Sequence, residues 1–209
     1  MKTDWHAAAL ARDVPPKVVV AAQFDGVELA VWRSASGKLS AWKDRCPHRG
    51  MRLSHGFVRG ETLSCIYHGW VYGTSGACQH IPAHPDLTPP SAIRADTYDC
   101  IEAGGVIWLA PLGTASAPPD LAGLTPVRTM FVNASAAQLS AAVPDLRGDH
   151  DLRGSVDMEG AAGELCLLLQ RRASGGVAVH LLCADQADRI RASRWLENLR
   201  RIAEEGVAA

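Results

Sequence analysis

The 209-residue sequence predicts a mainly β protein, built as a small barrel followed by a smaller α+β domain. Three observations support this prediction. The first half alternates short runs rich in β-branched and aromatic residues with turn sequences. A segment rich in Pro, Ala and Gly then separates two apolar regions, and the last 25 residues repeat apolar positions at helical spacing.

In the first half, we expect a strand wherever such a run lies between two turn sequences. Asp25-Gly26 is a strong hairpin turn, Gly104-Gly105 is a second, and 34–37 and 74–76 contain further turn residues. The expected strands are 18–24, 27–33, 39–43, 62–65, 70–72, 93–102 and 106–109. Together they would complete a small barrel.

The composition predicts a domain of residues 1–112, a linker of residues 113–126 and a second domain of residues 127–209. In the second domain we expect a strand at 127–132, a short helix at 135–143 and, at 144–163, either a loop or a strand with long turns. A hairpin of 165–170 and 177–183 follows. The closing helix would be capped by Asp185 and would pack through Ile190, Trp195, Leu199 and Ile202.

Charge and apolar content exclude several classes of function. The net charge is −1, so the chain as a whole has no electrostatic attraction for nucleic acid or an anionic membrane. The N-terminus has no apolar targeting segment and no run is long enough to cross a bilayer, which favours a cytoplasmic protein. The cysteines show no disulfide-like framework, and we expect Cys78, Cys100, Cys166 and Cys183 to be free thiols.

Two mixed Cys/His pairs, Cys46-Pro47-His48 and Cys65-Ile66-Tyr67-His68, are the most informative motifs. In a Rieske [2Fe-2S] centre, one iron is held by two thiolates and the other by two imidazoles. Two loops that each supply one Cys and one His fit this chemistry. A structural zinc site also uses two Cys and two His, but its ligands usually come in like pairs.

The wider motifs resemble the Rieske domain of aromatic-ring hydroxylating oxygenases, nearest to the vanillate O-demethylase type. The resemblance runs from about Trp5 to about Pro111 and rests on Cys46-Pro47-His48-Arg49-Gly50, Leu53-Ser54-x-Gly56, Cys65-x-Tyr67-His68-Gly69-Trp70-x-Tyr72, Gly76-x-Cys78 and Ile81-Pro82. It implies a Rieske-type barrel, a [2Fe-2S] cluster held by Cys46, His48, Cys65 and His68, and a second domain resembling a truncated helix-grip catalytic domain.

Oxygenases of this family also hold a mononuclear iron with two His and one carboxylate, in a catalytic domain more than twice as long as the segment present here. Only His150 and His180 follow His84, and they do not have the helical spacing of that motif. We therefore expect no mononuclear iron and no catalytic residue in this chain.

The resemblance implies an electron-transfer component of a ring-hydroxylating or O/N-demethylating oxygenase system. Its donor would be a flavin or iron–sulfur reductase or a ferredoxin, and its acceptor the mononuclear iron of a catalytic subunit in a head-to-tail, trimer-based hetero-oligomer. One alternative is a self-sufficient terminal oxygenase with unrecognised iron ligands. A redox sensor or structural module without turnover is another.

Arg45, Arg49 and Arg52 bracket the first Cys/His pair, with Lys43 nearby. They predict a positive collar that would attract an acidic electron donor. The alternative interpretation is that these arginines bind local carbonyls and carboxylates.

Overall fold

The computed structural model of the protein describes residues 4–148, 151–160, 162–172, 175–184 and 189–205. Within these residues the strands form three antiparallel sheets, of which the largest has the order β1-β10-β9-β4-β3-β2. Its outer strands β1 and β2 contact each other, so the sheet curls into a nearly closed barrel. The strands are β1 (His6–Leu10), β2 (Val19–Phe24), β3 (Val27–Arg33), β4 (Leu39–Lys43), β9 (Thr97–Ala103) and β10 (Val106–Ala110).

Two hairpins of this barrel depend on residues that adopt positive φ. Asp25 and Gly26 join β2 to β3 with φ values of 47° and 79°. Gly104 and Gly105 join β9 to β10 with φ values of 60° and 71°. Two successive residues with positive φ give a turn that matches the twist of the paired strands. Both predicted turns are confirmed.

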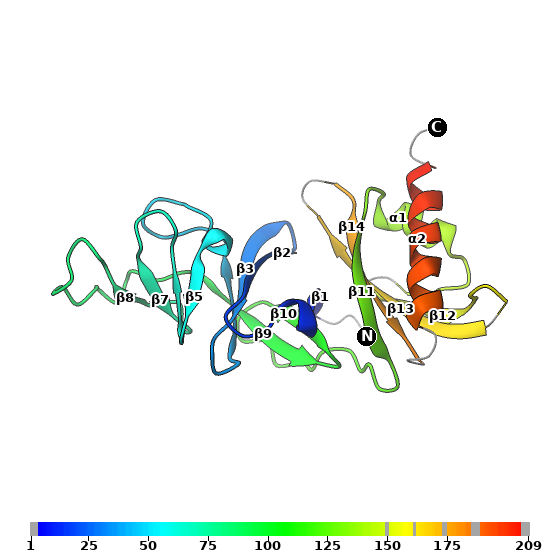
Figure 1. Ribbon diagram of the computed structural model, residues 1–209, viewed down its shortest axis with the longest axis horizontal. Coiled ribbons are helices and arrows are strands. Elements are labelled where there is room, and N and C mark those ends of the chain that lie inside the picture. Colours follow the sequence, from blue (N-terminus) through cyan, green and yellow to red (C-terminus); the bar gives the residue numbers. More distant parts are fainter. Residues whose placement is uncertain (1–3, 149–150, 161, 173–174, 185–188, 206–209) are drawn as a thin grey trace.

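A second sheet has the order β5-β6-β7-β8 and lies at the end of the molecule opposite α2 (Figure 1). Its strands have only three residues each: β5 (Phe57–Arg59), β6 (Thr62–Ser64), β7 (Val71–Gly73) and β8 (Cys78–His80). The loop from β4 to β5 contains Cys46 and His48, while the loop from β6 to β7 contains Cys65 and His68. Both motifs therefore lie at one end of the folded molecule.

The third sheet has the order β11-β14-β13-β12 and is covered by two helices. Its strands are β11 (Thr125–Val132), β12 (Asp151–Asp157), β13 (Ala162–Arg171) and β14 (Val177–Cys183), and the helices are α1 (Ala136–Ala142) and α2 (Arg189–Glu205). Ser135 caps α1 in a reciprocal capping box with Gln138. Residues 111–124 contain no helix or strand, and the predicted division at 113–126 stays a prediction.

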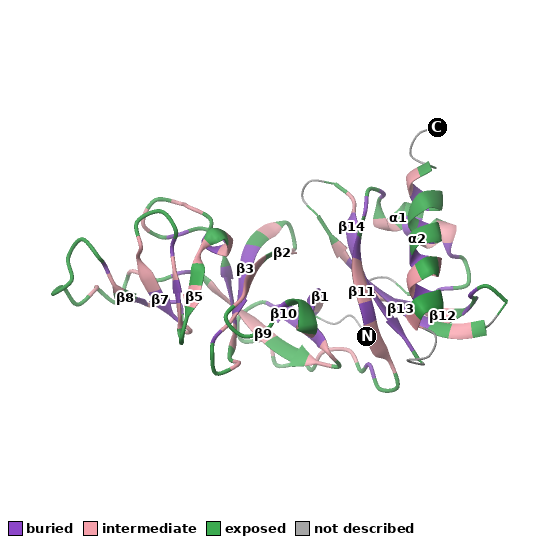
Figure 2. Cartoon of the chain, viewed as in Figure 1, coloured by how far each residue is buried: buried purple, intermediate pink, exposed green. Residues whose placement is uncertain are grey.

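The stretch 144–163, where a loop or a strand with long turns was expected, contains the strand β12, which pairs along its length with β13. Two other sequence predictions need correction. The buried face of α2 consists of Ala192, Leu196, Leu199 and Ala203, whereas Ile190 and Ile202 are 68% and 53% exposed. Most of the α2 ribbon that faces the viewer in Figure 2 is coloured as exposed. Strands β1, β5 and β8 were not predicted, since β1 is rich in Ala and the other two are very short. The predicted Asp185 cap lies outside the described residues.

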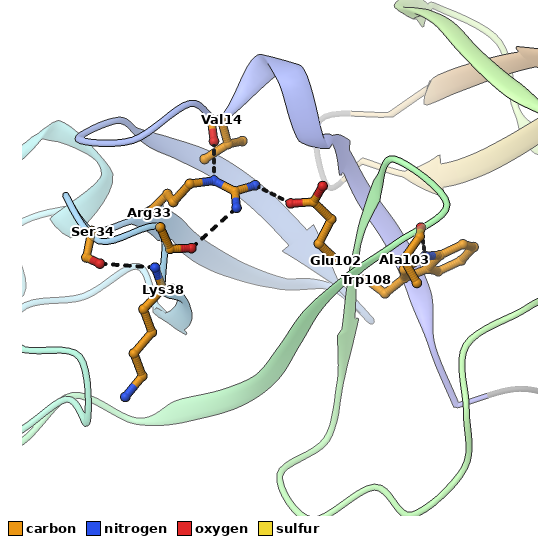
Figure 3. Close-up of polar contacts among 8 residues, drawn as sticks. Val14, Arg33, Ser34, Lys38, Glu102, Ala103 and Trp108 are labelled. Atoms are coloured by element: carbon orange, nitrogen blue, oxygen red, sulfur yellow. Dashed lines mark hydrogen bonds and ion pairs between the residues drawn. The ribbon is translucent and has the colours of Figure 1, made fainter.

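Arg33 ties together three segments of the barrel (Figure 3). Its guanidinium donates to the carbonyl oxygen of Val14 at 2.7 Å, to that of Gly37 at 3.4 Å and to the Glu102 carboxylate at 2.7 Å. Nearby, the Trp108 indole N–H donates to the Ala103 carbonyl oxygen at 3.1 Å. The Arg33–Glu102 pair holds the end of β3 against β9.

The barrel and the third sheet share a core. Leu10 and Trp108 of the barrel pack in one buried cluster with Cys166, Leu168 and Leu182 of the third sheet. The Gln170 amide also donates to the carbonyl oxygen of Gln23 across the seam at 2.8 Å. No described helix is both long and apolar enough to cross a membrane.

Candidate metal centre

The two Cys/His loops have the same backbone design. The Cys46 N–H donates to the Met51 carbonyl oxygen at 2.7 Å, and the Gly50 N–H donates to that of Cys46 at 2.8 Å. In the second loop, the Cys65 N–H donates to the Trp70 carbonyl oxygen at 2.9 Å, and the Gly69 N–H to that of Cys65 at 3.0 Å.

Each loop thus closes on a glycine four residues after its cysteine. Gly50 and Gly69 have φ values of 73° and 70°. A residue with a side chain adopts this conformation only with steric strain. A Cβ would also lie 3.1 Å from Arg45 Nε in the first loop and 3.1 Å from Pro82 Cγ in the second. The glycines therefore let each loop turn tightly enough to present its Cys and His on one side.

The loops bring the predicted ligands together in two pairs, the two thiols and the two imidazoles, although no group of three or more of these side chains converges on one point among the described residues. Cys46 and Cys65 are each 3% exposed, and their thiols interact with each other. The imidazoles of His48 and His68 lie with ring centroids 4.6 Å apart. His48 is half-buried and His68 is exposed, so this imidazole edge of the site faces outward.

Two aromatic residues support the site in ways that the sequence did not reveal. The Trp70 ring stacks on the His48 ring at 4.2 Å and 5° and fixes its plane. The Tyr72 hydroxyl lies 3.1 Å from Cys46 Sγ and is fully buried. In the sequence, the sign that both residues lie beside the predicted ligands was their place in the motif Cys65-x-Tyr67-His68-Gly69-Trp70-x-Tyr72.

The donor atoms fit a bound iron–sulfur cluster. His48 Nδ1 is buried and has no hydrogen-bond partner among the described residues, so its lone pair is available to a metal. Burial raises the pKa of the Cys65 thiol, and Cys46 raises it further. Burial, followed by His68 and Arg49, lowers the pKa of His48. Paired buried thiols become stable thiolates when a metal cation neutralises them, and neutral imidazole is the form that binds metal.

Asp44 anchors the first loop to the 3-10 turn Leu53–His55. Its buried carboxylate accepts from the Ser54 N–H at 2.7 Å and from the Ser54 hydroxyl at 2.6 Å. Arg52 lies 3.8 Å from the same carboxylate and also pairs with Glu28. Arg52 thus binds local carboxylates, as the alternative interpretation of the arginines expected.

Arg45 and Arg49 are placed differently from Arg52. Both are exposed and line a groove beside His48. Arg52 lines a separate hollow with Phe131 and Arg172. The structure therefore brings two of the three predicted docking residues together and separates the third.

Comparison with known families decides the nature of the site. Residues 4–95 match the family described as Rieske [2Fe-2S] domain. The chain carries a Rieske [2Fe-2S] domain. The predicted cofactor and mainly β fold are confirmed, and the zinc alternative is set aside. The cluster gives the Rieske domain a one-electron transfer role.

Two curated relatives from Pseudomonas putida match different lengths of the chain. Oxidoreductase NdmD is 36% identical over an alignment of 193 positions that covers 84% of this chain and 32% of NdmD. Methylxanthine N1-demethylase NdmA is 49% identical over 69 residues, which are 33% of this chain and 20% of NdmA. The chain thus spans a third or less of the length of these relatives, while others that match are oxygenase components.

The fold of the whole chain is also found in solved structures. The structure of NdmA from Pseudomonas putida CBB5 has a TM-score of 0.71 and covers 97% of this chain and 79% of its own, with 21% sequence identity. The third sheet and its helices thus share the fold of an oxygenase, as the truncated helix-grip prediction expected.

His180 is the one described histidine of the second half. Its Nδ1 lies 2.9 Å from the Thr129 hydroxyl, and the side chain is buried at the seam with the barrel. His150 lies outside the described residues.

Proposed function

We propose that this chain is the Rieske electron-transfer component of a multicomponent non-haem iron oxygenase system, serving ring hydroxylation or O/N-demethylation. Cys46 and Cys65 would bind one iron, and His48 and His68 the other. A reductase or ferredoxin supplies one electron at a time, and the chain passes it to a mononuclear iron on a partner subunit in a head-to-tail hetero-oligomer. None of the six cysteines forms a disulfide bond in the described part of the chain, which suits a reducing cytoplasm.

The location of the Cys/His loops carries this proposal. They lie at the end of the molecule opposite the third sheet (Figure 1). The side chain of His68 is exposed. Both an electron-donating protein and a partner subunit that accepts the electron can therefore approach the cluster at that end. The match to oxidoreductase NdmD supports the same interpretation, since it covers 84% of this chain and therefore continues into the third sheet.

Iron and sulfide counting of the anaerobically purified protein tests the proposal. Two irons and two sulfides per chain are expected. A third iron, with productive oxygen consumption by the chain and a reductase alone, supports the self-sufficient oxygenase instead. Native mass spectrometry of proteins that co-purify from the source organism checks the hetero-oligomer.

Ligand substitutions test the assignment of the four residues. Cys46→Ser and His68→Ala are expected to abolish the electron paramagnetic resonance signal of the reduced Rieske cluster, because each removes one metal ligand. Cys100→Ser is the control, since burial raises the pKa of that thiol to about 12 and β9 holds it outside the loops. A full signal in either ligand variant would refute the assignment.

A further inference from the structure

The groove beside His48 is strongly basic. It encloses about 430 Å³, and its ionisable side chains besides His48 are those of Lys43, Arg45, Arg49, Arg94 and Asp96. Four cations and one carboxylate give a formal charge of +3, in a chain whose net charge is −1. Positive charge is therefore concentrated at the imidazole edge of the Rieske site.

These cations are available to a partner. All four side chains are exposed, and among the described residues none of them forms an ion pair. Arg94 makes one hydrogen bond, to the Ser75 carbonyl oxygen at 3.1 Å. Arg52, by contrast, is paired with Glu28 and lies outside the groove.

Of the four basic residues in the groove, Arg94 is the one whose place there could not be predicted from sequence spacing. It is far from the first loop in sequence, but the Lys43 N–H donates to the Asp96 carbonyl oxygen at 2.9 Å. Ala77 and Arg94 form an isolated bridge that fixes the same segment against the small sheet. The segment before β9 thereby supplies the second wall of the groove.

We infer that this groove docks an acidic one-electron carrier protein and that Lys43, Arg45, Arg49 and Arg94 are its docking residues. The inference rests on the proposed function. The reduced carrier loses one electron and the oxidised cluster gains it; no bond is made or broken, and no proton transfer is required. Arg52 is not part of the docking surface.

The shape of the groove favours a protein over a small anion. Sites for small ligands are concave and mostly apolar and enclose most of the ligand. Here the charged groups are exposed at the surface and spread over two segments, which suits an opposing acidic surface. Complementary charge at the electron-entry edge raises the rate of productive encounter.

Stopped-flow reduction by a plant-type [2Fe-2S] ferredoxin tests the inference. This acidic carrier has a potential of about −400 mV, below the Rieske range, so electron transfer is downhill. For the variant K43Q/R45Q/R49Q/R94Q at low ionic strength, the second-order rate constant is expected to fall about tenfold or more, and its salt dependence to flatten. Arg59→Gln, an exposed residue of β5 outside the groove, should retain the wild-type rate.

Two further measurements separate docking from damage to the cluster. The iron content and paramagnetic signal of the quadruple variant should equal those of the wild type, and reduction by the small cation methyl viologen should not slow. A wild-type rate and salt dependence in the quadruple variant would overturn the docking inference. A wild-type protein without a reducible two-iron cluster would overturn the proposed function itself.

Discussion

Tyr72 is the residue through which the barrel core acts on the metal site. Its ring is fully buried 6.2 Å from that of Trp42, and its hydroxyl reaches Cys46 Sγ. Burial raises the pKa of Tyr72, and Cys46 raises it further, so the hydroxyl stays protonated and can donate to a thiolate. A donor to a ligand sulfur stabilises the reduced cluster, which carries more negative charge.

Tyr72→Phe is therefore expected to lower the reduction potential of the cluster. The loss of one hydrogen bond worth about 1 kcal/mol corresponds to about 40 mV for one electron. Protein-film voltammetry measures the change, with Tyr98→Phe in β9 as a control. An unchanged potential in Tyr72→Phe would show that the hydroxyl does not donate to Cys46.

At the scale of elements, α2 shows what periodicity predicts and what it leaves open. Apolar residues in this segment predicted a helix, and the helix forms. The small residues Ala192 and Ala203 lie on its buried face with Leu196 and Leu199, while the larger Ile190 and Ile202 are exposed. Small side chains allow the helix to approach the sheet closely, a preference that hydropathy alone does not express.

Truncation of two α2 side chains tests this corrected face. Leu196→Ala is expected to lower the free energy of unfolding by about 2–5 kcal/mol, because Leu196 is fully buried. Ile202→Ala is the matched control and should change it by about 0.5 kcal/mol or less. Chemical denaturation measures both, and equal losses would contradict the assigned face.

At the scale of the whole molecule, His180 lies where the third sheet meets the barrel. Burial lowers its pKa from 6.5 to about 4, and its Nε2 has no hydrogen-bond partner among the described residues. The Thr129 hydroxyl, bonded to His180 Nδ1, lies 3.4 Å from the Asp13 carboxylate of the barrel side. The seam thus holds a neutral imidazole.

This burial predicts lower stability in mild acid. Between pH 6.5 and about 4 the unfolded chain protonates His180 while the folded protein keeps it neutral. The contribution of His180 to the free energy of unfolding is fully present above pH 6.5. It falls as the pH drops, by up to about 1.4 kcal/mol per pH unit.

Denaturation at several pH values checks the His180 prediction. His180→Leu should lose this part of the pH dependence, while His84→Gln, at an exposed position, should retain it. A pH profile of His180→Leu identical to that of the wild type would contradict the prediction.

The sequence by itself predicted the Rieske [2Fe-2S] cluster. Cys46, His48, Cys65 and His68 are its predicted ligands through residue identity and spacing, and Asp25-Gly26 predicts a hairpin through its φ preference. Both are local properties of the chain. Only the tertiary structure decided which face of α2 is buried, that Tyr72 meets Cys46, and that Arg94 rather than Arg52 joins Arg45 and Arg49 beside His48. These contacts join segments distant in sequence, and long-range packing determines them.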